Sequence, residues 1–233
     1  SGSGSISLQG TGSAAGLSYN QGIKISQGTL STASGNIDID GTGHGSALFN
    51  SGVATYARAS VSAGGSGSLS IDGTGGNGTT YNEGVLLSGG SELSSVDGAL
   101  SITGTGQGSA TGNRGIQING RSSVQITGAG AVTLLGAGST TASGVYNSGV
   151  YSSYGTVQAN SGDLSITGNG GTGSSYNIGV RLIGGSYLST SGSLDIDGSA
   201  NAGTTGTRNY GVWIMNAQVG GGAGSSVSGT GGG

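Results

Sequence analysis

The sequence has no cysteine, no proline and few charged residues, and each absence excludes a class of structure or chemistry. Without cysteine there is no disulfide framework, no thiolate zinc site and no cysteine nucleophile. Proline cannot donate to a strand ladder, so its absence is typical of a chain made mostly of central strands. The six Lys and Arg residues form no basic stripe, and the net charge is −3, so we expect no nucleic-acid partner.

Long apolar runs and clustered catalytic residues are also missing. No run of eighteen apolar residues occurs, so we expect no transmembrane helix. The single histidine, His44, lies in a glycine-rich segment, where an exposed bystander is expected, and no pair of histidines can form. The nine acidic residues are dispersed, and we therefore predict no catalytic site, no cofactor and no metal. A polysaccharide-active enzyme is the weakest alternative, because it would need an acidic groove.

Glycine, in contrast, supplies 57 of the 233 residues and recurs with a fixed period. Such a period predicts stacked coils rather than a disordered linker. Equivalent glycines lie 30 to 32 residues apart, at Gly4, Gly35, Gly67, Gly98, Gly130, Gly162, Gly192 and Gly224.

Each unit contains three short apolar segments whose side chains alternate, which predicts three strands with one buried face. In the second unit these segments begin at Ile37, Val53 and Val61. We therefore predict an all-β fold, a single-stranded parallel β-helix of about seven coils, and a right-handed path by the rule for parallel crossovers. Residues 1–233 are expected to form one continuous segment, uncapped at both ends, that belongs to a longer chain or to an end-to-end fibre.

One phrase, Asn-x-Gly followed by Val or Ile, returns in every unit and predicts a coil corner. Stacked amide side chains can hydrogen-bond to one another, and Asn tolerates the left-handed conformation that tight turns need. The glycine would allow positive φ or a close approach of the next strand. The predicted ladder consists of Asn20, Asn50, Asn82, Asn113, Asn147, Asn177 and Asn209 with Gly22, Gly52, Gly84, Gly115, Gly149, Gly179 and Gly211.

The residue before each corner Asn is aromatic in five of seven units. These positions hold Tyr19, Phe49, Tyr81, Gly112, Tyr146, Tyr176 and Arg208. Rings at one position of successive coils would stack as a column. The column has two interpretations: a structural ladder that seals the corner, which we favour, and an aromatic strip that binds sugars.

The outward positions of the second predicted strand are less polar than those of the first. We predict a possible contact wall for lateral or subunit packing, with carbohydrate binding as an alternative; the other possibility is that a neighbouring loop covers it. The predicted wall comprises Leu86, Tyr151, Arg181, Ile183, Trp213 and Met215.

Asp-x-Asp-Gly occurs at Asp38 and again at Asp195, which raises the question of calcium. Calcium β-rolls need a nonapeptide repeat, which this chain lacks. A cation bridging Asp40 and Asp72 is kept only as a minor hypothesis.

The repeats resemble those of filamentous-haemagglutinin-type large exoproteins. The resemblance rests on units such as Gly162-Asp-Leu-Ser-Ile-Thr-Gly168 followed by Tyr176-Asn-Ile-Gly-Val180, and it extends over essentially the whole chain. It implies a right-handed β-helical shaft of a secreted or cell-surface bacterial fibre. The secretion domain of that family, with its Asn-Pro motifs, is absent from this sequence.

From these observations we expect a structural, non-enzymatic shaft located outside the cell or on its surface. Its expected partner is itself, as a homo-oligomer or filament. The alternative is an adhesin surface that binds a carbohydrate or a host-cell receptor.

Overall fold

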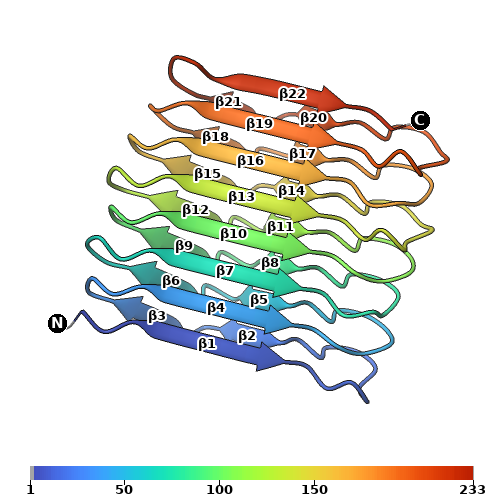
Figure 1. Cartoon of the computed structure of the whole chain (residues 1–233), viewed down its shortest axis with the longest axis horizontal. Coiled ribbons are helices and arrows are strands. Elements are labelled where there is room, and N and C mark those ends of the chain that lie inside the picture. Colours follow the sequence, from blue (N-terminus) through green and yellow to red (C-terminus); the bar gives the residue numbers. More distant parts are fainter. Residues whose placement is uncertain (1–2, 233) are drawn as a thin grey trace.

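The computed structural model describes residues 3–232, and its regular structure is entirely β, in three parallel sheets (Figure 1). The first sheet contains β1 (Ile6–Thr11), β4 (Ile37–Thr42), β7 (Leu69–Thr74), β10 (Leu100–Thr105), β13 (Val132–Ala137), β16 (Leu164–Asn169), β19 (Leu194–Ser199) and β22 (Ser226–Thr230). The second contains β2 (Ile23–Ser26), β5 (Val53–Tyr56), β8 (Val85–Leu87), β11 (Ile116–Asn119), β14 (Val150–Ser153), β17 (Val180–Ile183) and β20 (Val212–Met215). The third contains β3 (Thr29–Thr32), β6 (Ser60–Ala63), β9 (Glu92–Ser95), β12 (Ser123–Ile126), β15 (Thr156–Ala159), β18 (Tyr187–Ser189) and β21 (Gln218–Gly220).

Each strand pairs with the equivalent strand of the next coil, so the predicted β-solenoid of three strands per coil is confirmed. The register follows the glycine period: Ile37 of β4 pairs with Leu69 of β7, and Asp40 pairs with Asp72. In Figure 1 the chain passes along the first sheet in front, returns through the second and third behind it, and rises one coil, which is a right-handed path. Within residues 3–232, no helix could span a membrane.

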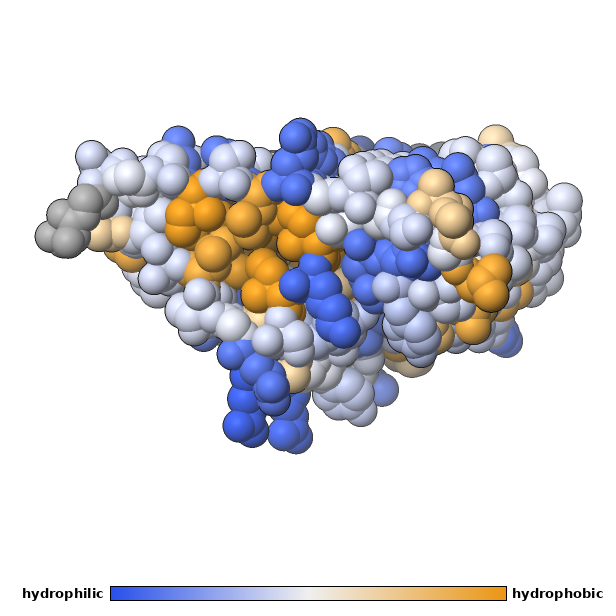
Figure 2. Space-filling model, turned by 90° about the horizontal axis from the view of Figure 1, so that it is seen from below, coloured by the Kyte–Doolittle hydropathy of each residue, from blue (hydrophilic) through white to orange (hydrophobic). Residues whose placement is uncertain are grey.

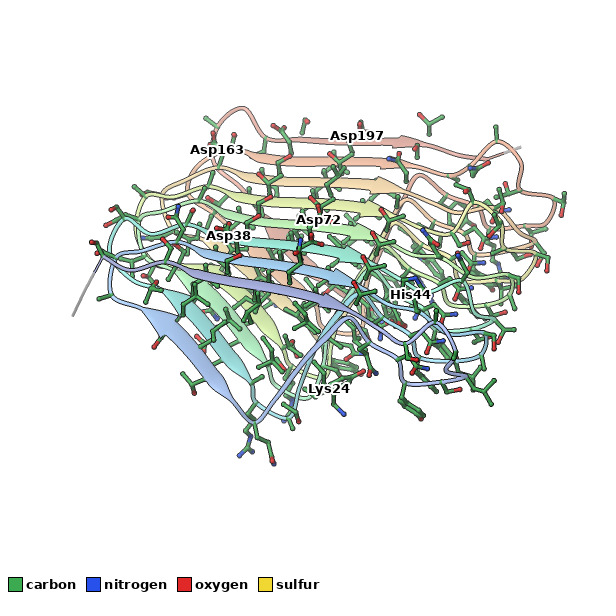
Figure 3. All side chains as sticks on the ribbon, turned by 60° about the horizontal axis from the view of Figure 1, so that its bottom comes forward. Lys24, Asp38, His44, Asp72, Asp163 and Asp197 are labelled. Carbon is green, nitrogen blue, oxygen red and sulfur yellow. The ribbon has the colours of Figure 1, made fainter. Side chains whose placement is uncertain are left out.

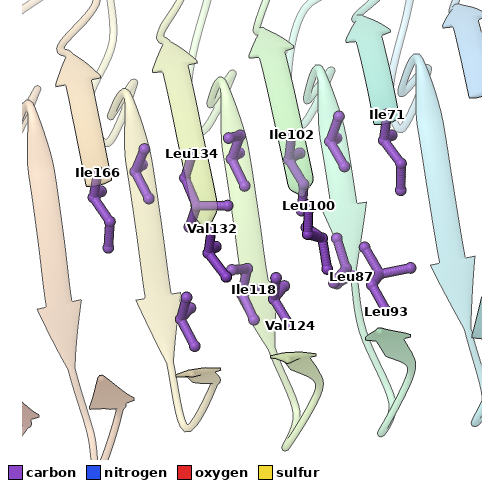
Figure 4. Packing of buried hydrophobic residues seen from close by; sticks show 14 of the residues in the cluster. Ile71, Leu87, Leu93, Leu100, Ile102, Ile118, Val124, Val132, Leu134 and Ile166 are labelled. Carbon is purple, nitrogen blue, oxygen red and sulfur yellow. The ribbon is translucent and has the colours of Figure 1, made fainter. Parts of the chain in front are cut away.

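The interior consists of aliphatic columns, because the same inward positions of every coil carry Ile, Leu or Val (Figure 4). Leu100, Ile102, Ile116, Ile118 and Val124 are all fully buried. Burial of one such side chain contributes about 1.5–3 kcal/mol, and a single coil could not bury its own apolar side alone. Stacking of coils is therefore what makes the core.

The corner asparagines form a continuous hydrogen-bonded ladder along the solenoid. The backbone N–H of each donates to the side-chain Oδ1 of the next, as from Asn82 to Asn113 at 3.0 Å and from Asn113 to Asn147 at 2.9 Å. The side-chain Nδ2 of Asn113 also donates to the Thr79 carbonyl at 2.9 Å. The ladder runs from Asn20 through Asn50, Asn82, Asn113, Asn147 and Asn177 to Asn209.

The sequence leads us to expect Asn in the left-handed conformation of the corner. In the structure, the residue that precedes the Asn adopts this conformation instead. All seven residues at that position have φ between 55° and 74°, including Tyr19, Phe49 and Tyr81. This conformation costs an ordinary residue about 1–2 kcal/mol. The glycine two residues after the Asn has no positive φ. It is required because the next coil passes very close to it.

Core side chains are less covered in the first coil than in the middle of the solenoid. Figure 2, which looks onto that coil from below, shows a contiguous hydrophobic patch left of the centre of the view. Five partly buried side chains of the first coil pack against the core there: Ile6, Leu8, Ile23, Ile25 and Leu30.

Candidate functional site

The aromatic residues before the corner asparagines stack over the outer side of the second sheet in two groups. In the first, the ring centroids of Tyr19 and Phe49 lie 5.1 Å apart, and those of Phe49 and Tyr81 lie 5.3 Å apart, with nearly parallel planes. In the second, Tyr146 lies 5.0 Å from Tyr176. We call the first group, Tyr19, Phe49 and Tyr81, the lower aromatic column.

Stacking within the column determines what it can offer a ligand. The Phe49 ring has a neighbouring ring against each of its faces. A sugar ring stacks on an aromatic face, and both faces of Phe49 are already occupied, so the middle of the column presents ring edges to its surroundings. The exposed Tyr19, at the lower end, has one face on which no other ring of residues 3–232 stacks. This arrangement favours the structural interpretation of the column over the sugar-binding strip.

The column is interrupted in the fourth coil, where Gly112 replaces an aromatic residue. Gly112 has φ of +74°, and a Cβ there would lie 2.6 Å from the Tyr81 ring. The Arg114 guanidinium also lies near this gap, 5.9 Å from the Tyr81 ring and 4.5 Å from the Tyr151 ring. A cation therefore continues the stack where a ring is missing.

The predicted contact wall is only partly exposed. Leu86, an outward position of the predicted wall, is only 6% exposed. It lies at the bottom of a cavity that is also lined by the aromatic rings of the lower column. Tyr151 and Trp213 are half-buried, and the Arg181 guanidinium lies between them, 5.3 Å and 4.9 Å from their rings. Ile183 is also half-buried, and Met215 is exposed. The structure therefore brings five of the six residues together on β14, β17 and β20, where Tyr151, Arg181 and Trp213 are register partners and Ile183 pairs with Met215. Leu86 lies apart on β8, and the Arg181 guanidinium interrupts the apolar surface.

A buried polar cluster that sequence reasoning missed lies under the lower column. Glu83 is 2% exposed; its Oε2 accepts a hydrogen bond from Ser51 at 3.1 Å, and its Oε1 lies 3.9 Å from Arg114 Nη1. Arg114 donates to Gln117 at 2.5 Å. Burial raises the pKa of Glu83, although Arg114 and the hydrogen bonds oppose the shift. Burial, with the Glu83 charge, also raises the pKa of Tyr56 to about 12.

Glu83→Gln is expected to alter how stability depends on pH. Because the pKa of folded Glu83 is raised, the native state binds more protons than the unfolded state above the unfolded value, which is about 4.3. The free energy of unfolding of the original protein should fall, relative to that of the variant, as pH rises from 4 to 8. Urea unfolding at several pH values measures this difference.

The control for this experiment is Glu92→Gln, which removes a charge from an exposed glutamate. Its pH profile should run parallel to that of the original protein. A parallel profile for Glu83→Gln as well would contradict the assignment of the buried carboxyl.

A cleft lies beside the lower column, with a volume of about 450 Å³. Its floor includes Glu83 and Leu86, and the column forms one side. Along the other side, at the ends of the second-sheet strands, stand Ser26, Tyr56, Ser88 and Asn119. The remaining lining residues are Gln21, Lys24 and Gln117.

The acidic residues of the first sheet lie on a different side of the coil from Lys24 (Figure 3). Asp40 and Asp72 are register partners, and burial, followed by repulsion from Asp40, raises the pKa of Asp72. Gln9 donates to Asp40 at 3.4 Å. Within residues 3–232, no three His, Cys, Asp or Glu side chains gather into a possible metal site. His44 is half-buried, whereas the sequence leads us to expect an exposed side chain.

Comparisons with protein-family models, with curated proteins and with solved structures found no match to this chain.

Proposed function

We propose that the chain is a structural shaft: a rigid, non-enzymatic segment of an extracellular bacterial fibre or adhesin that associates with copies of itself. The observation that supports this most is the continuous register of three parallel sheets, the first of which has eight strands. Each coil is a template for the next, which is how a solenoid builds length. The bacterial and extracellular parts of the proposal rest on the resemblance of the repeats to filamentous-haemagglutinin-type exoproteins.

Self-association of the 233-residue chain is proposed to occur by stacking of coils. Among the described strands, β1 pairs with β4 alone, so the outer edge of β1 offers backbone groups to another strand. The partly covered aliphatic side chains of the first coil lie beside that edge (Figure 2). A second copy that presents the edge of β22 would continue both the ladder and the core.

Sedimentation velocity and electron microscopy of this chain test the proposal. Seven coils at about 4.8 Å give a unit of about 34 Å, so end-to-end particles should lengthen in steps of that size with concentration. The double change Leu8→Lys and Ile25→Lys should abolish lengthening, since it places charges among the first-coil side chains. Leu135→Lys, at an exposed position of the first sheet, is the control and should have no effect.

Ile183→Lys separates end-to-end from lateral association, because Ile183 belongs to the predicted contact wall away from the first coil. Loss of particles in this variant alone would assign the contact to the wall. A chain that stays monomeric at all concentrations would contradict self-association.

A second candidate function, glycan binding by an adhesin surface, is favoured by one observation, the cleft beside the lower aromatic column.

A further inference from the structure

The cleft of the second sheet combines several features of a ligand site. Its volume, about 450 Å³, lies within the range of small-molecule sites, about 300–1,000 Å³. It spans the first four coils, from Lys24 to Asn119. A ligand in the cleft would therefore lie along the solenoid axis and contact several coils at once.

Tyr56 supplies an aromatic face to this cleft. Its register partner in the coil below is Ser26, and its equivalent in the coil above is Ser88, so no ring stacks on it from either side. The rings of the lower column, in contrast, stack on each other at 5.1 and 5.3 Å. A pyranose ring packs its C–H groups against such a face, and Tyr56 is the residue placed to receive it.

Uncharged polar groups surround this ring. Hydroxyls come from Ser26 and Ser88, and side-chain amides come from Gln21 and Asn119. The Asn119 Oδ1 is buried and has no hydrogen-bond partner in the structure. This amide therefore gains a partner if its side chain turns toward a ligand in the cleft, and neutral donors and acceptors of this kind suit a polyhydroxylated ligand.

The charge of the cleft is positive at its surface. The Lys24 side chain is exposed, with its Nζ 5.6 Å from the Tyr56 ring centre. The carboxyl of Glu83 is buried below and already engaged by Ser51 and Arg114. An ammonium without an exposed acidic neighbour in the cleft favours a ligand that carries a carboxylate.

We propose that this cleft binds a short acidic oligosaccharide, with one sugar ring on Tyr56 and its carboxylate on Lys24. The inference deepens the second candidate function, glycan binding, and is independent of the structural shaft.

Isothermal titration calorimetry with trigalacturonate, and with the neutral trisaccharide galactotriose, tests the proposal on the 233-residue chain. Trigalacturonate should bind, and galactotriose should bind about tenfold more weakly, because it has no carboxylate for Lys24. Tyr56→Ser should reduce the affinity for both sugars at least tenfold. Lys24→Gln should remove the preference for the acidic sugar and leave the neutral one unchanged.

Both variants place residues that this fold already accepts at those positions. Serine occupies the Tyr56 position in the first coil, and glutamine occupies the Lys24 position in the fourth. The matched controls, Tyr154→Ser and Arg58→Gln, alter exposed residues outside the cleft and should bind like the original protein. Urea unfolding midpoints verify that all four variants are folded.

Equal binding of the two trisaccharides would overturn the acidic specificity and leave glycan binding standing. Absence of binding by both would overturn the inference and the second candidate function together. Binding that is unchanged in both Tyr56→Ser and Lys24→Gln would show that the ligand binds elsewhere, and would overturn the assignment of the binding site to this cleft. The proposed structural-shaft function is tested separately, by the sedimentation velocity experiment.

Discussion

Gly149→Ala is expected to destabilise the solenoid by about 3 kcal/mol or more, or to prevent its folding. Gly149 is a corner glycine of the middle coils, and it is buried. A Cβ at this position would lie 2.4 Å from the backbone N of Asn169 and 2.7 Å from the carbonyl O of Gly136. Both are backbone atoms of paired strands, so neither can move without breaking the register between β13 and β16.

Urea unfolding measures this loss, and Gly220→Ala is the matched control. Gly220 lies in β21 with no atom within 4 Å of the added Cβ. Alanine there meets no obstacle and also restricts the unfolded chain, so stability should stay the same or rise by about 0.4–1 kcal/mol. A Gly149→Ala protein as stable as Gly220→Ala would show that the coils are spaced more widely than in this structure.

The strands were predictable because burial in a solenoid is periodic in two ways. Alternation within a strand assigned Val85 and Leu87 to the interior, and the unit length placed them over Val53 and Thr55 in the coil below. These inferences need no knowledge of the turns. The same alternation correctly directed Leu86 outward but could not show that it is buried.

The burial of Leu86 depends on the turn before it. Phe49 and Tyr81 adopt positive φ, which an aromatic residue ordinarily avoids, and sequence propensity assigns that conformation to Gly or Asn. Here stacking between coils, worth about 0.5–1.5 kcal/mol per ring pair, offsets much of the cost. The positive φ of an aromatic residue is therefore offset by a contact with the neighbouring coil, and the sequence of one repeat unit alone does not predict it.

The Glu83 cluster did leave a signal in the sequence. Glu83 and Arg114 occupy the variable position of the Asn-x-Gly phrase in successive coils, and the structure places them 3.9 Å apart. A comparison of that position between neighbouring units therefore pairs the two charges from the sequence alone. The cleft has no comparable signal, because its lining residues come from the corners and strand ends of four coils.

Asn113→Ala is expected to cost about 3 kcal/mol, since it opens the asparagine ladder in its buried middle. The Oδ1 of Asn113 accepts from the backbone N–H of Asn82 at 3.0 Å and from the Asn82 Nδ2 at 3.1 Å. Its own Nδ2 donates to the Thr79 carbonyl at 2.9 Å. Alanine would leave the buried Asn82 N–H without its partner, at about 1–3 kcal/mol, and would also remove the bonds to the Asn82 Nδ2 and the Thr79 carbonyl, at about 0.5–1.5 kcal/mol each. The Thr79 carbonyl still accepts from the Ala110 N–H at 2.9 Å.

Asn20→Ala is the matched control, because it changes the same residue type where the ladder begins. The Asn20 side chain donates to the Ser18 carbonyl at 3.1 Å and to Asn50 Oδ1 at 3.4 Å, and the residue is only half-buried. Water can replace those bonds, so the loss should stay below about 1 kcal/mol. The difference between the two urea unfolding free energies isolates the effect of burial on one hydrogen-bonded ladder. If both substitutions cost the same, the ladder would contribute no more inside the solenoid than at its edge, and packing of the aliphatic columns would have to hold the corners alone.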